Sequence, residues 1–155
     1  MNHDVKSYIE SDEIQSFIED HPDHYLANVF IPDSSENNIE VGIYNRDDEE
    51  MKTFTAEGIE TSSELARTGR PIEKLDITKD LLSFSSAVNH ARAEVDTAEP
   101  LTRIMGVLQK AEGPTWTITL ITKSYTVHTV RLQASTGKHI ETTSNSMMSW
   151  VKNDT

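Results

Sequence analysis

Cysteine is absent from this chain of 155 residues, glycine occurs only six times, and hydrophobic residues make up 35% of the sequence. Without cysteine the chain has no disulfide, no thiolate nucleophile and no Cys-ligated zinc site. No apolar run approaches the ~20 residues that a membrane-spanning helix needs. The sequence therefore predicts a protein without a membrane span, built from small modules with much surface.

The first residues, MNHDVKSYIESDE, lack the apolar segment of a signal peptide and carry early acids. We therefore expect a cytoplasmic protein. The alternative is an extracytoplasmic protein whose leader has been removed.

Positive charge is scarce in the first half of the chain. Residues 1–80 hold 20 Asp and Glu against 7 Lys and Arg, a net charge of −13, whereas residues 81–155 hold 6 against 7, a net charge of +1. Binding to nucleic-acid phosphates needs clustered Lys and Arg. We therefore expect no direct nucleic-acid ligand, and the acidic half either favours solubility or faces a basic partner.

The second half has the clearest local pattern. Over residues 83–94 an apolar side chain recurs every three or four positions, which predicts a helix. Residues 101–109 form a predicted strand, and residues 116–142 are predicted to form an antiparallel meander. The apolar positions change parity near His128 and Thr129, which indicates a β-bulge there. Gly137 suits the left-handed position of the last hairpin.

The first half shows a comparable order of elements. A short helix is expected from Ser11 to the helix-breaking pair His21-Pro22, followed by strands over 25–31, 39–44 and 51–55. The tail Gly58-Ile59-Glu60-Thr61 matches His139-Ile140-Glu141-Thr142, which indicates an internal duplication.

These patterns predict an α+β fold of two tandem helix-plus-antiparallel-meander units, with the helices packed on one face of the sheet. The first unit would span residues 1–66 and be divergent and acidic. A linker would cover residues 67–80. The second unit would span residues 81–155 and end in a helix over residues 145–152, which contain Met147, Met148 and Trp150.

Three segments of the second half resemble a PepSY-type domain: the helix Ser85-Ser86-Ala87-Val88-Asn89-His90-Ala91, the strand Val130-Arg131-Leu132-Gln133-Ala134, and the turn Ser135-Thr136-Gly137-Lys138 before Ile140. The match covers roughly 60 residues, and Gln133 stands where the family commonly has Asp. Tandem units of this type are also similar to β-lactamase-inhibitor-like proteins. The resemblance implies a non-catalytic module with an inhibitory or peptide-binding role, as in protease propeptides and cell-envelope regulatory proteins.

Candidate chemical sites are few. His21, Asp23 and His24 are the densest group of metal-ligand residues, but Pro22 prevents the histidines from converging on one helical face. We therefore predict no metal site and no cofactor. No nucleophile elbow and no phosphate-binding loop occurs in the sequence, so we predict that the chain is not an enzyme.

Two groups of residues are candidates for binding a partner. The first lies on the meander, where a threonine-rich strand face suits protein contact: Thr117, Thr119, Thr122 and Thr126. His128 is a further candidate on the meander. Trp116 is most simply a core anchor, and a partly exposed ring there would be a binding hot spot. The second is an acidic hairpin tip: Asp47, Asp48, Glu49 and Glu50.

Together these features predict a protein-binding or regulatory module that is a monomer or homodimer and contacts an unidentified protein, and the family resemblance implies an inhibitory role for it. The alternative is an acidic decoy that blocks a basic nucleic-acid-binding surface with residues 1–80. A third class, a hydrolase with an unrecognised site, would need a deep pocket lined by convergent acids or histidines.

Overall fold

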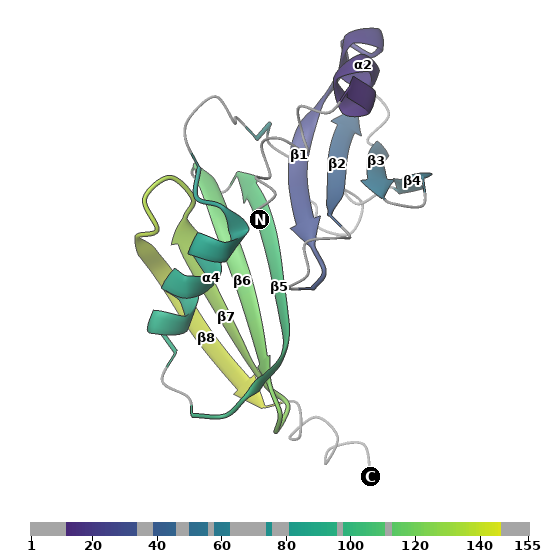
Figure 1. The fold of residues 1–155 in the computed structure, drawn as a ribbon. Helices are drawn as coiled ribbons and strands as arrows, with labels where there is room; N and C mark the ends of the chain where they lie inside the picture. Colours follow the sequence, from purple (N-terminus) through teal and green to yellow (C-terminus); the bar gives the residue numbers. More distant parts are fainter. Residues whose placement is uncertain are drawn as a thin grey trace.

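The structure is a computed structural model that describes residues 12–33, 39–45, 50–55, 58–62, 74–75, 81–95, 98–110 and 113–146. Its two described helices and eight strands are shown in Figure 1. They are α2 (Asp12–Asp20), β1 (His24–Ile31), β2 (Glu40–Asn45), β3 (Glu50–Thr55), β4 (Gly58–Ser62), α4 (Phe84–Ala93), β5 (Leu101–Lys110), β6 (Pro114–Thr122), β7 (Thr126–Gln133) and β8 (His139–Ser146).

All eight strands belong to one antiparallel sheet with the order β4-β3-β2-β1-β5-β6-β7-β8. Strands β1 and β5 join its two halves through four residue pairs, from Asn28 with Gln109 to Ile31 with Gly106. The prediction of two tandem helix-plus-meander units is therefore wrong. The physical reason is that β1 pairs with β5 as well as with β2, so the strands of both halves form a single sheet. The antiparallel meander predicted for residues 116–142 is confirmed.

Helix α4 covers the half of the sheet that β5–β8 form (Figure 1). It begins where predicted, because the Ser83 hydroxyl accepts a hydrogen bond from the backbone N–H of Ser86 at 3.2 Å. Phe84, Ala87 and Ala91 form its buried face. The Phe84 ring lies against β5 at Gly106, where an added Cβ would be 2.6 Å from the ring.

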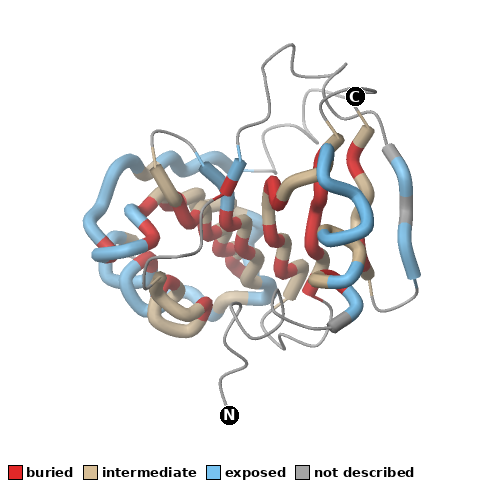
Figure 2. The backbone as a smooth tube through the Cα atoms, turned by 90° about the horizontal axis from the view of Figure 1, so that it is seen from above, coloured by how far each residue is buried: buried red, intermediate tan, exposed pale blue. Residues whose placement is uncertain are grey.

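Helix α2 packs on the same face of the sheet, in the β1–β4 half. Its Phe17 ring meets Phe54 of β3 edge to face, with ring centroids 5.1 Å apart. The cross-strand pairs connect this face from Phe54 through Val41 and Val29 to Leu108 below α4. The two helices and both halves of the sheet therefore share one hydrophobic core, and Figure 2 shows its buried residues along the inner strands.

The predicted bulge at His128 and Thr129 is wrong. Strands β6 and β7 pair without interruption from Thr115 with Gln133 to Ile121 with Val127. The parity change has another cause: Val127 lies on the face away from α4, whereas Val130 is fully buried in the core below α4. Register shifts occur instead between residues 101 and 103 and between residues 131 and 132. The left-handed Gly137 is confirmed, with φ of 78°.

The predicted C-terminal helix over residues 145–152 is wrong at its start, because Asn145 and Ser146 belong to β8; residues 147–152 lie outside the described part of the chain. In the predicted linker, residues 74–75 are described. Leu75 is buried and its N–H donates a hydrogen bond to the carbonyl of Leu26 at 2.8 Å. None of the described helices has the length and apolar character to span a membrane.

Candidate functional site

The structure separates the residues that the sequence grouped on one threonine-rich face. Thr117 and Thr119 pair with Arg131 and Thr129 on the face away from α4. Thr122 and Thr126 belong to the other face by the strand alternation, and Thr122 is buried. The predicted single face is therefore two surfaces, because Thr122 lies three positions after Thr119 and an odd number of steps along a strand changes face.

Trp116 is a core residue. Its side chain is fully buried, its Nε1–H donates a hydrogen bond to the carbonyl of Leu82 at 3.0 Å, and its ring lies 5.9 Å from that of Phe84. A fully buried ring cannot reach a partner on the surface, so the predicted binding role of Trp116 is wrong.

The face of β5–β8 away from α4 is a second candidate surface on this half of the molecule. It consists of the alternate residues of 103–107, 117–121, 127–131 and 141–145, all half-buried or exposed. We call this set of residues the open face. Both described helices pack on the opposite side of the sheet, so these side chains face away from the helices.

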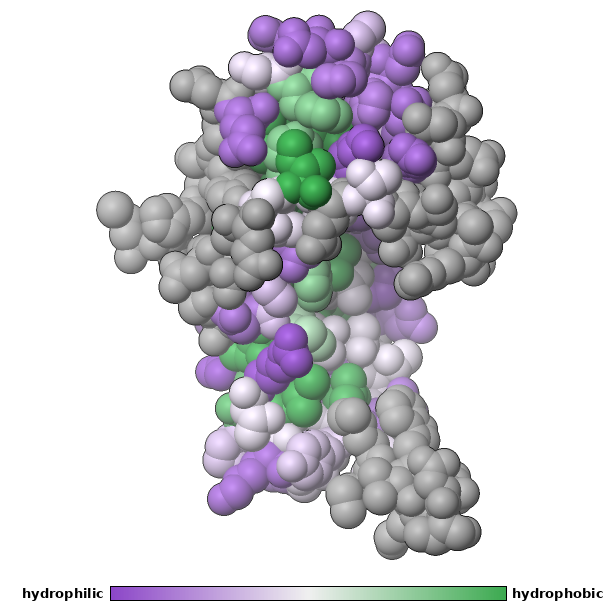
Figure 3. Space-filling view, turned by 90° about the vertical axis from the view of Figure 1, so that its right-hand side faces the viewer, coloured by the Kyte–Doolittle hydropathy of each residue, from purple (hydrophilic) through white to green (hydrophobic). Residues whose placement is uncertain are grey.

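The open face combines hydroxyl and apolar side chains. One row across the sheet runs from Met105 through Thr119 and Thr129 to Thr143, and the next contains Ile121 and Val127. Figure 3 shows such a mixture of apolar and weakly polar side chains on the half of the molecule that β5–β8 form. These apolar residues were not among the predicted site residues, although the parity change at Val127 was their signal.

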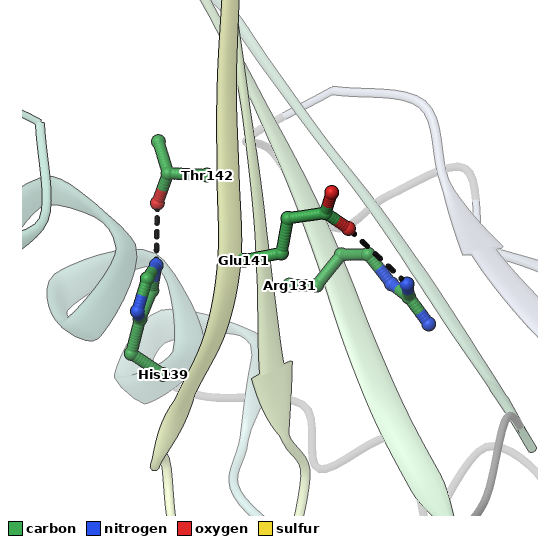
Figure 4. A network of polar contacts seen from close by, with 4 residues as sticks. All are labelled: Arg131, His139, Glu141 and Thr142. Atoms are coloured by element: carbon green, nitrogen blue, oxygen red, sulfur yellow. Dashed lines mark hydrogen bonds and ion pairs between the residues drawn. The ribbon is translucent and has the colours of Figure 1, made fainter.

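One ion pair lies at the outer end of the open face. Arg131 Nη1 is 3.4 Å from Glu141 Oε2, and both side chains project from β7 and β8 on the same side (Figure 4). Both groups are more than one-third exposed, so the pair contributes at most about 1 kcal/mol to stability. Its larger effect is to hold the charge of Glu141 toward β7.

On the helix side of β8, a second polar cluster joins the strand to α4. His139 Nε2 is 2.6 Å from the Thr142 hydroxyl (Figure 4). The Nδ1 of His139 is 4.0 Å from Glu94 Oε2 on α4. The ring of His90 lies against Gly137, where an added Cβ would be 2.7 Å from Nε2. These contacts fix the β7–β8 turn against the helix. No group of His, Asp or Glu among the described residues could hold a metal ion.

A third polar network surrounds the β6–β7 turn. The backbone N–H of Ser124 donates to Glu99 Oε2 at 3.2 Å, and the Ser124 hydroxyl lies 3.2 Å from that of Thr122. Hydrogen bonds from the Ser124 hydroxyl and backbone, and from Thr122, lower the pKa of Glu99, against a smaller opposing effect of desolvation, and the charge of His128 adds to the lowering. The network ties residues 98–100 to the turn.

His128 of β7 makes a side-chain hydrogen bond with β8. Its Nδ1 lies 2.7 Å from the Ser144 hydroxyl, and the ring is half-buried on the helix side of the sheet. In nucleophilic catalysis a serine is hydrogen-bonded to a histidine that acts as its base. Catalysis also needs a third group that orients the histidine and donors that stabilise a developing oxyanion. In this position the hydrogen bond joins two neighbouring strands, as a cross-strand pair does.

The predicted acidic tip is described at Glu50 alone, and Asp47, Asp48 and Glu49 lie outside the described residues. Glu50 Oε2 is 3.8 Å from Lys52 Nζ on the same strand.

The histidines that the sequence grouped as metal-ligand residues lie in an aromatic cluster. His21 stacks on Phe17 with ring centroids 4.1 Å apart, and His24 meets both rings edge to face. The two histidines therefore belong to an aromatic cluster between α2 and β1.

No family model and no curated protein matches the chain. Among solved structures, the chain is similar to the crystal structure of a putative lipoprotein from Clostridium difficile 630. The TM-score is 0.58 and the sequence identity 16%, and the match covers 93% of this chain and 100% of that chain. At this identity the likeness concerns the fold alone.

Proposed function

We propose that the protein is a non-enzymatic binding module that contacts another protein through the open face of β5–β8. The observation that carries the proposal is that no described helix covers this face: α2 and α4 both pack on the other side of the sheet, while half-buried Met105, Ile121 and Val127 lie on this side. Covering these side chains would remove apolar surface from water at roughly 25 cal/mol per Å².

The composition of the open face suits recognition of a protein. Aliphatic side chains supply buried area, whereas the neighbouring hydroxyls of Thr119 and Thr129 give hydrogen bonds that set orientation. Arg131 and Glu141 at the outer end resemble the polar rim of an interface. The resemblance to PepSY-type domains adds a regulatory or inhibitory role to this proposal.

The test is a comparison of two tagged variants that introduce the same charge on opposite sides of the sheet. Thr129→Lys places an ammonium group in the middle of the open face, and Asn89→Lys places one on the exposed side of α4. We expect Thr129→Lys to lose the partners that the unchanged protein retains from native lysate, and Asn89→Lys to keep them. Circular dichroism checks that both variants fold.

Equal recovery of every partner by the two variants would exclude the open face as the contact surface. If Asn89→Lys alone loses the partners, the contact surface lies on the side of the sheet that carries α4. Recovery of no stoichiometric partner by the unchanged protein, in repeated experiments, would count against a binding module altogether.

For location, we propose the extracytoplasmic alternative rather than the cytoplasm. The support is that the fold is shared with a protein described as a putative lipoprotein. Fractionation of cells that express the native gene with a C-terminal tag tests the location. Recovery of the tag in the cytoplasmic fraction would contradict it.

The acidic-decoy alternative lacks a specific observation in its favour. At the acidic hairpin tip, Asp47, Asp48 and Glu49 lie outside the described residues, and Glu50 is paired with Lys52. It is tested by the salt dependence of binding, as argued in the Discussion.

A further inference from the structure

The two edges of the sheet differ in how well they are protected against pairing with another strand. Edge strands usually carry lysine, proline or a bulge, or are very short, because an unpaired row of N–H and C=O groups can pair with another chain. Strand β4 is the short edge, with five residues. Strand β8 has eight residues, contains neither lysine nor proline, and is exposed at every residue except the half-buried Thr142. Its one irregularity is the extra residue Ile140 near its start, so residues 141–146 form a regular edge.

We propose that β8 is a self-association edge that pairs antiparallel with β8 of a second copy, with Thr143 opposite Thr143. Among the described strands, β8 has β7 on one side and is the last strand of the sheet on the other. The pairing would give a continuous sheet through both copies. The proposal concerns the edge of the sheet and does not depend on the function proposed for the open face.

Symmetry restricts the register of such a pair. A two-fold axis perpendicular to the sheet keeps each face on its own side, so opposed residues must belong to the same face. The centre of β8 can therefore lie on Thr142 or on Thr143. The register shift between Arg131 and Leu132 leaves Ile140 as an extra residue of β8, because Arg131 pairs with Glu141 and Leu132 with His139. Centring on Thr143 pairs the regular residues 141–145 with one another, whereas centring on Thr142 would place Ile140 opposite Ser144. The Thr143-centred register is therefore favoured.

The side chains that meet in this register are compatible. Thr143 of one copy would lie opposite Thr143 of the second copy, so the row of Thr119, Thr129 and Thr143 would continue across the interface. Threonine pairs of this kind stabilise opposed strands. Glu141 would face Asn145 of the second copy, so the single charged carboxylate of β8 would not oppose itself. Ile140, which is 44% exposed, would face Ser146 of the second copy and lose exposure.

The charge distribution favours this edge over β4. Among the described residues, 12–62 carry nine Asp and Glu against one Lys, whereas 81–146 carry three Asp and Glu against six Lys and Arg. The first group includes β1–β4, which lie at the other end of the strand order. Pairing through β8 would therefore bring the described basic halves together and keep the described acidic halves apart. Pairing through β4 would do the opposite and place the acidic halves side by side.

The absence of cysteine makes disulfide trapping a direct test of both edge and register. Opposed Cα atoms in an antiparallel pair are about 4.5–5.5 Å apart, which is within the range that a disulfide spans. We expect Thr143→Cys to form a covalent dimer on mild oxidation. Thr61→Cys on the β4 edge is the matched control and should remain monomeric.

Two further cysteine variants test the register. Glu141→Cys and Asn145→Cys should each remain uncrosslinked alone, because residues 141 and 145 face each other and not themselves. Their mixture should form a mixed disulfide dimer. Sedimentation velocity of the unchanged protein should show a monomer–dimer equilibrium. Asn145→Lys should lower the dissociation constant of the dimer and Asn145→Glu should raise it, each on the order of tenfold. The reason is that the contact between residue 145 and Glu141 occurs twice per dimer.

Several outcomes would overturn the proposal. If Thr143→Cys crosslinks no more than Thr61→Cys, β8 is not the associating edge. Equal crosslinking of all four single variants would indicate random collision. A dimer that responds to neither substitution at Asn145 would exclude the Thr143-centred register, and an unchanged protein that is monomeric at every accessible concentration would exclude self-association.

Discussion

Replacing Trp116 with phenylalanine tests whether this residue belongs to the core, as the structure shows, or to a binding surface. The indole is fully buried and its Nε1–H donates to the carbonyl of Leu82 at 3.0 Å. Phenylalanine would lose that hydrogen bond, at about 1 kcal/mol because Leu82 is only half-buried and its carbonyl can be rehydrated. The space left by the smaller ring would cost about 1–2 kcal/mol more.

The expected loss of about 2–3 kcal/mol corresponds to a fall in melting temperature of roughly 5–10 °C for a chain of this length. Thermal unfolding followed by far-ultraviolet circular dichroism measures it. The control is Tyr125→Phe, since Tyr125 is 57% exposed and the change should be within about 0.5 kcal/mol. If Trp116→Phe melts at the same temperature as the control, the indole is not buried. Trp116 would then be a surface residue that a partner could contact.

Three other predictions concern packing, charge and cooperativity. Gly106→Ala should lower the free energy of unfolding in urea by about 1–3 kcal/mol, because the added methyl would lie 2.6 Å from the Phe84 ring; an unchanged midpoint would contradict this contact. The pKa of Glu99 is lowered in the folded protein, so its ionised form adds stability above the unfolded pKa that is lost as pH falls through the lowered folded pKa. Glu99→Gln should therefore melt earlier than the unchanged protein at neutral pH and equally in acid, and a difference that grows in acid would reverse the sign. Because one core includes Val29 and Leu108, unfolding should be a single transition by circular dichroism and by fluorescence, whereas two separated transitions would indicate two independent units.

The elements that the sequence predicted best are those with local causes. Helix α4 begins at a serine cap and shows its three-and-four spacing within ten residues. The alternation of Trp116, Ile118 and Leu120 fixes the buried face of β6 within five residues. Neither feature depends on a distant part of the chain, so a single sequence is sufficient to find both.

The join between β1 and β5 has no such local cause. Val29 and Leu108 lie opposite each other in the sheet but 79 positions apart in the sequence, and either could have belonged to a separate sheet. A repeated order of elements is compatible with two modules or with one sheet. What decides between them is the burial of apolar side chains at the join, and that burial is a tertiary property.

The misplaced bulge and the misassigned threonine face have a common origin. Both interpretations assumed that one side of the meander is apolar and the other polar. In the structure the open face carries Val127 and Ile121 beside its threonines. Val127 then appeared to be out of step with Val130, although β7 alternates regularly. An apolar residue on the polar parity of a strand was thus the sequence signal for the open face.

Salt dependence separates the possible interactions of this molecule because its acidic residues lie mainly in the first half of the sequence, residues 1–80. An acidic decoy would bind a basic partner through residues 1–80, and screening would weaken that binding as salt rises. Pairing through β8 brings together two copies that each carry −12, so screening would leave the dimer unchanged or strengthen it. The sign of the salt effect therefore identifies which end of the sheet is in contact. Asn145→Glu should alter the dimer while leaving an acidic-end contact intact, because β8 lies at the opposite edge of the sheet from β4.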